Sequence, residues 1–172
     1  TLQVGADAAV KITISYDADA PRQSPKIDVN GVPTEVNGPY RNLPEPATVE
    51  PRRAFACSKV QRDMILQANR DMHGGNIESD LKGFKYPCES GVCEEPIFLK
   101  DPDKKPAPAS NEPDRAEIHH VVRATDKRGC PWGTNSNKNA AVISQRLNKH
   151  LYNTPPSAVE VTQINAVPPS PL

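Results

Sequence analysis

The sequence predicts an α+β fold built around a strand–loop–strand–helix unit in its C-terminal half. One strand is expected over residues 116–122, and a second β-branched run ends at Ser144. Ser144 is a good helix N-cap, and helix formers follow it, so a helix is expected from about residue 145 to residue 153. The segment between the strands, residues 126–138, is rich in Gly, Asn and Lys and is expected to be a loop.

The remaining elements are weaker in pattern. Apolar residues recur at helical spacing over residues 52–72, and the following Gly74-Gly75 pair predicts the end of that helix. Short strands are also predicted at 8–16 and 96–100, and a last element at 159–167. Nineteen prolines and an aromatic content of 5% indicate a loop-rich, thinly packed protein.

A domain boundary is predicted near residues 43–51, where three prolines punctuate the chain. Before it, two β-rich runs flank Asn30-Gly31 and predict a hairpin. Residues 1–50 are therefore interpreted as a short β appendage or the remnant of a preceding domain. Residues 51–172 are interpreted as the main domain, with residues 116–153 as its functional core.

Charge and hydropathy narrow the classes of partner. Lys+Arg and Asp+Glu number 21 each, so the chain as a whole does not favour nucleic acid. Residues 115–150, however, contain seven Lys/Arg but only one Glu and one Asp. This local excess of five positive charges favours binding to a phosphate backbone. No apolar run reaches membrane-spanning length, so no membrane partner is expected. The chain opens at Thr without a signal-peptide pattern, which suggests a processed or excised C-terminal part of a longer protein.

Four cysteines allow three pairings, and the sequence does not choose among them. Cys88 and Cys93 are candidates for a disulfide that closes a small hairpin, which leaves Cys57 and Cys130 to pair. Free thiols are the alternative. A zinc site ranks below both, because the spacings differ from the usual two-residue knuckles.

The residues that bear chemistry are His119 and His120 on the first strand and Asn148 on the helix. Phosphodiester hydrolysis needs an activated water and a cation that neutralises the charge developing on the phosphate. An imidazole with a pKa near neutrality suits the first task, and an imidazole with an amide oxygen suits the second. Adjacent strand residues point to opposite faces, so both imidazoles reach one ion only through a bulge or a strand end at this pair.

These residues sit in four pieces whose order resembles the HNH (ββα-metal) endonucleases. The pieces are His119-His120, residues 133–136 (Gly-Thr-Asn-Ser), residues 139–144 (Asn-Ala-Ala-Val-Ile-Ser) and Asn148. More narrowly, they resemble the His-Asn-Asn variety found at the C-termini of bacterial polymorphic toxins. Residues 68–70, 74–75 and 79–81 also resemble the segment that precedes the hairpin in those toxins, so the likeness covers about residues 56–153.

The resemblance implies a role for each matching residue. His119 would be a metal ligand where the family often has Asp, and His120 would be the general base. Asn139 would bond backbone across the loop and hold the catalytic hairpin. Asn148 would be the second metal ligand, where His is commoner. One divalent ion is implied: Asn148 favours Mg²⁺, the first expectation, whereas His119 in place of Asp favours Zn²⁺ or Ni²⁺, and Mn²⁺ is a further alternative.

The expected function is a metal-dependent DNA endonuclease that acts as an antibacterial toxin or effector domain. It would be secreted or delivered from a bacterium to act in the target-cell cytoplasm, and a cognate acidic immunity protein is expected. An RNase on the same scaffold and a non-catalytic, Pro-rich binding or structural module remain alternatives. Five basic residues are candidates for contacts with the nucleic acid: Arg123, Arg128, Lys138, Arg146 and Lys149.

Overall fold

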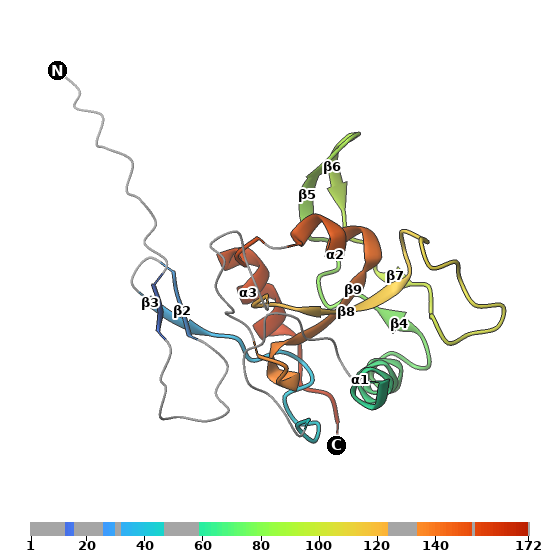
Figure 1. Cartoon of the computed structure of the whole chain (residues 1–172), viewed down its shortest axis with the longest axis horizontal. Helices are drawn as coiled ribbons and strands as arrows, with labels where there is room; N and C mark the ends of the chain where they lie inside the picture. Colours follow the sequence, from blue (N-terminus) through green and yellow to red (C-terminus); the bar gives the residue numbers. More distant parts are fainter. Residues whose placement is uncertain are drawn as a thin grey trace.

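The computed structural model describes residues 13–15, 26–29, 32–46, 59–123, 134–152 and 154–171 of the chain. Within these ranges the protein is a mixed α+β structure, as predicted, with small antiparallel sheets and helices packed around them (Figure 1). The elements are β1 (Thr13–Ser15), β2 (Lys26–Val29), β3 (Val32–Glu35), α1 (Lys59–Met72), β4 (Ile77–Glu78), β5 (Lys85–Cys88), β6 (Gly91–Glu94), β7 (Phe98–Leu99), β8 (Ala116–His120), the short 3₁₀ helix η1 (Asn137–Asn139), β9 (Ala140–Ser144), α2 (Gln145–Leu151) and α3 (Ala158–Ala166).

The predicted strand–loop–strand–helix unit is formed by β8, β9 and α2, which cross the middle of the molecule in Figure 1. The prediction that Ser144 caps the helix is confirmed, since its hydroxyl accepts a hydrogen bond from the Leu147 amide at 3.2 Å. Every residue of β9 is buried, which explains why this strand reads as a continuous run of small and β-branched residues.

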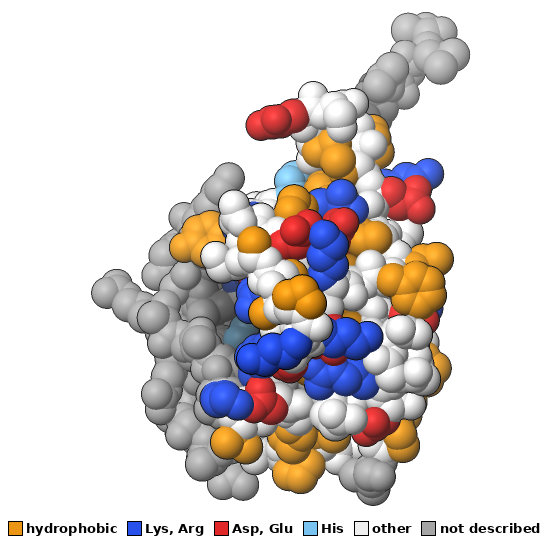
Figure 2. Space-filling view, turned by 90° about the vertical axis from the view of Figure 1, so that its right-hand side faces the viewer, with side chains coloured by type: hydrophobic (Ala, Val, Ile, Leu, Met, Phe, Trp, Pro, Cys, Tyr) orange, Lys and Arg blue, Asp and Glu red, His pale blue; other side chains and the backbone are white. Residues whose placement is uncertain are grey.

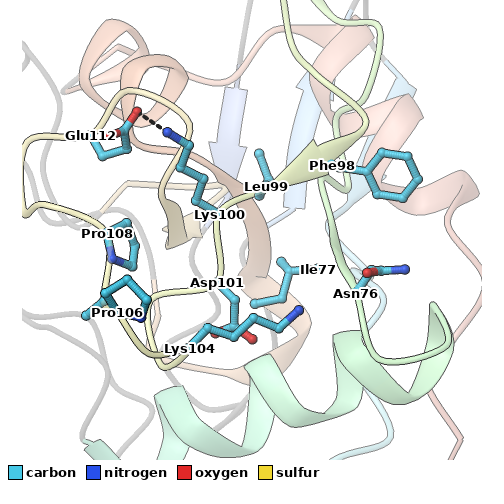
Figure 3. A pocket seen from close by; sticks show the side chains of 11 residues that line it. Asn76, Ile77, Phe98, Leu99, Lys100, Asp101, Lys104, Pro106, Pro108 and Glu112 are labelled. Carbon is cyan, nitrogen blue, oxygen red and sulfur yellow. Dashed lines mark ion pairs between the residues drawn. The ribbon is translucent and has the colours of Figure 1, made fainter.

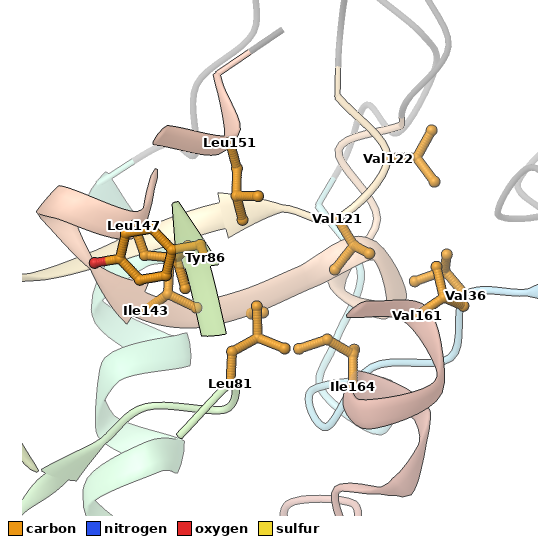
Figure 4. Packing of buried hydrophobic residues seen from close by; sticks show 11 residues of the cluster. Val36, Leu81, Tyr86, Val121, Val122, Ile143, Leu147, Leu151, Val161 and Ile164 are labelled. Carbon is orange, nitrogen blue, oxygen red and sulfur yellow. The ribbon is translucent and has the colours of Figure 1, made fainter. Parts of the chain in front are cut away.

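The two faces of the β8–β9 ribbon support two different hydrophobic clusters. On one face, Ala141 and Ile143 pack with Leu147 of α2 and with Ile164 of α3 (Figure 4). On the other face, Val142 packs with residues of α1. The ribbon is thus the central layer of the molecule, with α2 and α3 on one side and α1 on the other (Figure 1).

The pairing of β8 with β9 is regular, with His119 opposite Ala141 and His120 opposite Ala140. Neighbouring strand residues face opposite sides, so His119 lies on the α2 and α3 side and His120 on the α1 side. The bulge that would turn both imidazoles toward one ion is absent from this described pair of strands. The expectation that His119 and His120 converge is therefore wrong.

The predicted hairpin near the N-terminus is confirmed in its strands, since β2 and β3 pair antiparallel on either side of residues 30–31. The predicted boundary at 43–51, by contrast, does not separate this piece from the main body. Val36 and Tyr40 are fully buried in the two clusters, and the Gly38 amide donates to the Lys138 carbonyl at 2.8 Å. Residues 36–46 therefore belong to the body that carries β8 and β9.

The first helix and the last element were also predicted. α1 ends before Gly74 and Gly75, whose φ angles of 61° and 88° lie in the region that glycine adopts readily. α3 occupies the predicted final element. Val60 is one of the apolar residues whose spacing predicted this helix, but it is 76% exposed. The remainder of that prediction, residues 52–58, lies outside the described residues.

The Cys88–Cys93 disulfide is confirmed and closes the β5–β6 hairpin. Cys57 and Cys130 lie outside the described residues. Among the residues that the structure describes, no helix is both long enough and apolar enough to cross a membrane.

Candidate functional site

The two residues predicted as metal ligands lie together. His119 comes from β8 and Asn148 from α2, and 2.9 Å separates the His119 Nδ1 atom from the Asn148 Oδ1 atom. The N-cap at Ser144 starts α2 directly at the end of β9, so the helix folds back over the ribbon and carries Asn148 to the His119 face. The imidazole is 3% exposed and the carboxamide is partly buried.

Glu117 fixes the orientation of the Asn148 carboxamide. It lies two residues before His119 on the same face of β8, and its Oε2 atom accepts a hydrogen bond from Asn148 Nδ2 at 2.8 Å. Its Oε1 atom accepts a second hydrogen bond from Gln145 Nε2 at 2.9 Å. Because the amide nitrogen of Asn148 is held by Glu117, its oxygen faces His119.

The other nitrogen of His119 meets a buried carboxylate. His119 Nε2 lies 3.0 Å from Glu160 Oε1, which belongs to α3 and is 1% exposed. Arg123 completes this group, with Nη1 3.0 Å from Glu160 Oε1 and Nη2 3.2 Å from Glu160 Oε2. Its Nε atom also donates to the Leu151 carbonyl at 3.2 Å.

Arg123 was predicted as a nucleic-acid contact, and that prediction is wrong for this structure. The residue is 7% exposed, and its donors are occupied by Glu160 and by backbone carbonyls. A guanidinium that compensates a buried carboxylate is unavailable to a phosphate in solvent. Arg123 is an internal counter-charge.

The protonation pattern of this group follows from its contacts. Burial, together with the positive charge of Arg123, lowers the pKa of His119, so the ring is neutral near pH 7. Burial alone would raise the pKa of Glu160, but the hydrogen bond from His119 and the charge of Arg123 hold it below its usual value. Because the carboxylate paired with Arg123 is an acceptor, His119 Nε2 is the donor of this hydrogen bond, and in a neutral ring Nδ1 then carries the lone pair.

An Nε2 proton leaves the Nδ1 lone pair of His119 facing the Asn148 oxygen at 2.9 Å. The same 2.9 Å is the length of a hydrogen bond when Nδ1 carries a proton, and of two ligand atoms beside one ion when it does not. Two ligands bound at right angles, each about 2.1 Å from an ion, are about 3.0 Å apart. The pair therefore fits two neighbouring positions in the shell of a divalent ion.

These two donors are an incomplete ligand set. Within the described ranges, no three His, Cys, Asp or Glu side chains are grouped so as to hold a metal ion. A site made of His119 and Asn148 would leave most ligand positions to water and to oxygen atoms of a bound molecule. Because the imidazole is 3% exposed, these would have to reach the ion from the side of the partly exposed Asn148. Mg²⁺ and Mn²⁺ suit such a shell better than Zn²⁺ in a closed structural site.

His120, predicted as the general base, lies apart from this pair on the α1 side of the ribbon. Its Nε2 atom is 3.1 Å from Asn135 Oδ1. Burial lowers its pKa to about 4, so this ring is neutral near pH 7 as well. A neutral imidazole accepts a proton, but the structure does not bring His120 to the His119–Asn148 pair.

Asn139 holds the loop as the sequence analysis expected. It is fully buried, and its Oδ1 atom accepts a hydrogen bond from the Val122 amide at 2.8 Å. Its Nδ2 atom donates to the Val122 carbonyl and to the Thr134 carbonyl, both at 2.9 Å. Asn139 thereby ties together the two ends of the segment that joins β8 to β9.

The other basic candidates differ in their availability. Arg146 is directed toward Asp114, with 3.3 Å between Nη2 and Oδ1. Lys149 is exposed next to Asn148 and donates to Gln145 Oε1 at 3.0 Å, and Lys138 is partly exposed in η1. Arg128 lies outside the described residues. Figure 2 shows one face of the molecule, on which Lys and Arg side chains gather in a central band with Asp and Glu side chains beside them.

A groove of about 490 Å³ lies elsewhere, between β7 and the loop that follows it (Figure 3). Phe98 and Leu99 form one side, and Pro106 and Pro108 lie across from them. None of the predicted site residues lines it. Charged side chains also line the groove, but Lys100 pairs with Glu112 and Asp101 with Arg70, so they are engaged within the protein. The His119–Asn148 pair is therefore the better candidate site.

Glu117 and Glu160 are the site residues that the sequence analysis missed. Glu117 could have been found, because it shares a strand face with His119 through the two-residue period. The sequence around Glu160 suggests a different role for it. Ser157 caps α3, and its hydroxyl accepts a hydrogen bond from the Glu160 amide at 3.1 Å. The two residues therefore have the spacing of a capping box, in which Glu160 would bond back to the start of the helix. In the structure the Glu160 side chain bonds His119 instead.

Comparison with known proteins identifies no relative. No family model, no curated protein and no solved structure matches the chain.

Proposed function

We propose that this protein is a metal-dependent endonuclease that hydrolyses DNA phosphodiester bonds, with β8, β9 and α2 as a ββα-metal core. The observation that carries the proposal is the pairing of His119 Nδ1 with Asn148 Oδ1 at 2.9 Å on the buried side of the ribbon. It is supported by the order of the elements and by the buried Asn139, which hydrogen-bonds to Val122 and Thr134 at the two ends of the segment between β8 and β9.

Each residue has a distinct task in this proposal. His119 and Asn148 bind one divalent ion, Mg²⁺ being the first candidate, and the ion supplies charge neutralisation at the phosphate. Asn139 keeps the β8–β9 loop in place. Of the predicted basic residues that the structure describes, Lys149 is exposed and Lys138 and Arg146 are partly exposed, so these three remain candidates for contact with a phosphate backbone. His120 is assigned as general base from the sequence pattern, and its Nε2 atom lies 3.1 Å from Asn135 Oδ1.

The biological setting is proposed from the sequence pattern as well. A nuclease of this kind would serve as an antibacterial toxin domain, delivered into the cytoplasm of a target cell. The producing cell then needs an inhibitor, and a small acidic immunity protein would complement the basic residues of the segment 115–150.

The test is a nicking assay on supercoiled plasmid with Mg²⁺, Mn²⁺, Ni²⁺ or Zn²⁺, with a single-stranded RNA in parallel. The wild-type protein is expected to nick the plasmid only when a divalent ion is present, and Asn148→Ala is expected to lose at least about a hundredfold in rate. Asn76→Ala is the matched control, because Asn76 is exposed and lies outside the site.

The remaining outcomes separate the alternatives. Cleavage of RNA without cleavage of DNA would show that the substrate is RNA, and the proposed ion site would stand. No cleavage of either polymer with any of the four ions would refute the enzyme and leave a non-catalytic module. Unchanged cleavage by His120→Ala would remove His120 from the mechanism without affecting the ion site.

A further inference from the structure

Glu160 lies in α3, outside the β8–β9–α2 unit, and is not one of the residues that resemble the nuclease motif. Its carboxylate nevertheless lies 3.0 Å from His119 Nε2, within hydrogen-bond distance. It is also almost fully buried, and Arg123 pairs with both of its oxygen atoms. A carboxylate–arginine pair placed behind an imidazole is costly to bury, so its position calls for an explanation.

We propose that Glu160 is a positioning residue: it holds the proton of His119 on Nε2, so that the Nδ1 lone pair faces Asn148 Oδ1 and the divalent ion. This inference rests on the proposed function for the presence of the ion. The contact from which it is argued joins Glu160 of α3 to His119 of β8. Ligand histidines commonly donate their second ring N–H to a carboxylate, which fixes both the tautomer and the ring orientation.

The surrounding contacts fit this role. Without an acceptor at Nε2, the one strong acceptor left to the ring is Asn148 Oδ1, and the proton would move to Nδ1 and block the lone pair. Arg123 supports the contact between Glu160 and His119, because its guanidinium pairs with both carboxylate oxygens of Glu160 and fixes where they point. Arg123 and Glu160 thus act on the ion only through His119.

The experiment measures Mn²⁺ affinity by calorimetry and the ring ¹⁵N shifts of His119 by NMR near neutral pH. Two variants probe the role: Glu160→Gln, which removes the charge, and the double variant Arg123→Met with Glu160→Leu, which replaces the buried pair by apolar side chains and guards against loss of folding. Asp80→Asn is the matched control, because Asp80 is also buried but contacts Tyr40 and β9 instead of His119.

Both variants are expected to bind Mn²⁺ about 10- to 100-fold more weakly than wild type, and Asp80→Asn is expected to bind with wild-type affinity. The double variant should also move the ring proton from Nε2 to Nδ1. A folded variant that binds Mn²⁺ within about twofold of wild type would overturn the positioning role while the nuclease stands. Absence of Mn²⁺ binding by wild type would instead refute the ion site, whatever the tautomer shows.

Discussion

Removal of the Asn139 side chain offers a sharp test of how the site loop is held. The side chain is fully buried and makes three hydrogen bonds to backbone, with distances of 2.8, 2.9 and 2.9 Å. Asn139→Ala leaves the Val122 amide, the Val122 carbonyl and the Thr134 carbonyl without these partners. At about 1 kcal/mol for each lost bond, the variant should lose about 3 kcal/mol in free energy of unfolding.

The assay is urea denaturation followed by far-ultraviolet circular dichroism, with exposed Asn42→Ala as the control. A loss of about 3 kcal/mol is a large share of the stability of an ordinary domain, so the midpoint should move clearly. Asn139→Asp keeps an acceptor for the Val122 amide but places a buried carboxylate oxygen against the Val122 and Thr134 carbonyls, so its loss should be at least as large as that of Asn139→Ala. A change below about 0.5 kcal/mol for Asn139→Ala would refute the reasoning, because it would mean that water or a local shift replaces all three bonds.

Two further perturbations test the packing around the ribbon. Burial raises the pKa of Asp80 from 3.8 to about 7, so between these values the folded protein retains a proton that the unfolded chain releases. The free energy of unfolding should therefore fall as pH rises from about 4 to about 7, by up to about 4 kcal/mol. Melting temperatures across this range should show a shallower slope for Asp80→Asn than for wild type, and parallel slopes would contradict the assignment. Gly38→Ala should cost about 1–3 kcal/mol, because a Cβ atom there would lie 2.8 Å from the backbone oxygens of Lys138 and Ala140. Asn37→Ala, at the neighbouring exposed position, is its control in the same denaturation assay, and equal stabilities would refute the close approach.

The local pattern predicted the ribbon and its helix because each has a strong, short-range signal. Ser144 sits where a β-branched run meets helix formers, and its capping hydrogen bond to Leu147 depends on no distant residue. The Cys88–Cys93 disulfide is similarly local. The pairing of His119 with Asn148 followed from placing a strand and a helix side by side, which the short β9–α2 junction enforces.

The errors arise where the partner lies far along the chain. Arg123 counts as a positive charge in the sequence, but Glu160, 37 residues later, neutralises it inside the protein. The boundary near residues 43–51 followed from prolines alone, whereas Tyr40 donates to Asp80 at 2.9 Å across 40 residues. His119 and His120 were expected to converge because the motif pairs them, but the regular register with β9 separates them.

The most direct test of the ion site is a crystal grown with Mn²⁺ and measured for anomalous scattering. One peak is expected about 2.1 Å from both His119 Nδ1 and Asn148 Oδ1, with water in the remaining positions of the shell. A well-diffracting crystal without a peak between these two side chains, although Mn²⁺ is present at a concentration that supports plasmid nicking, would contradict the account.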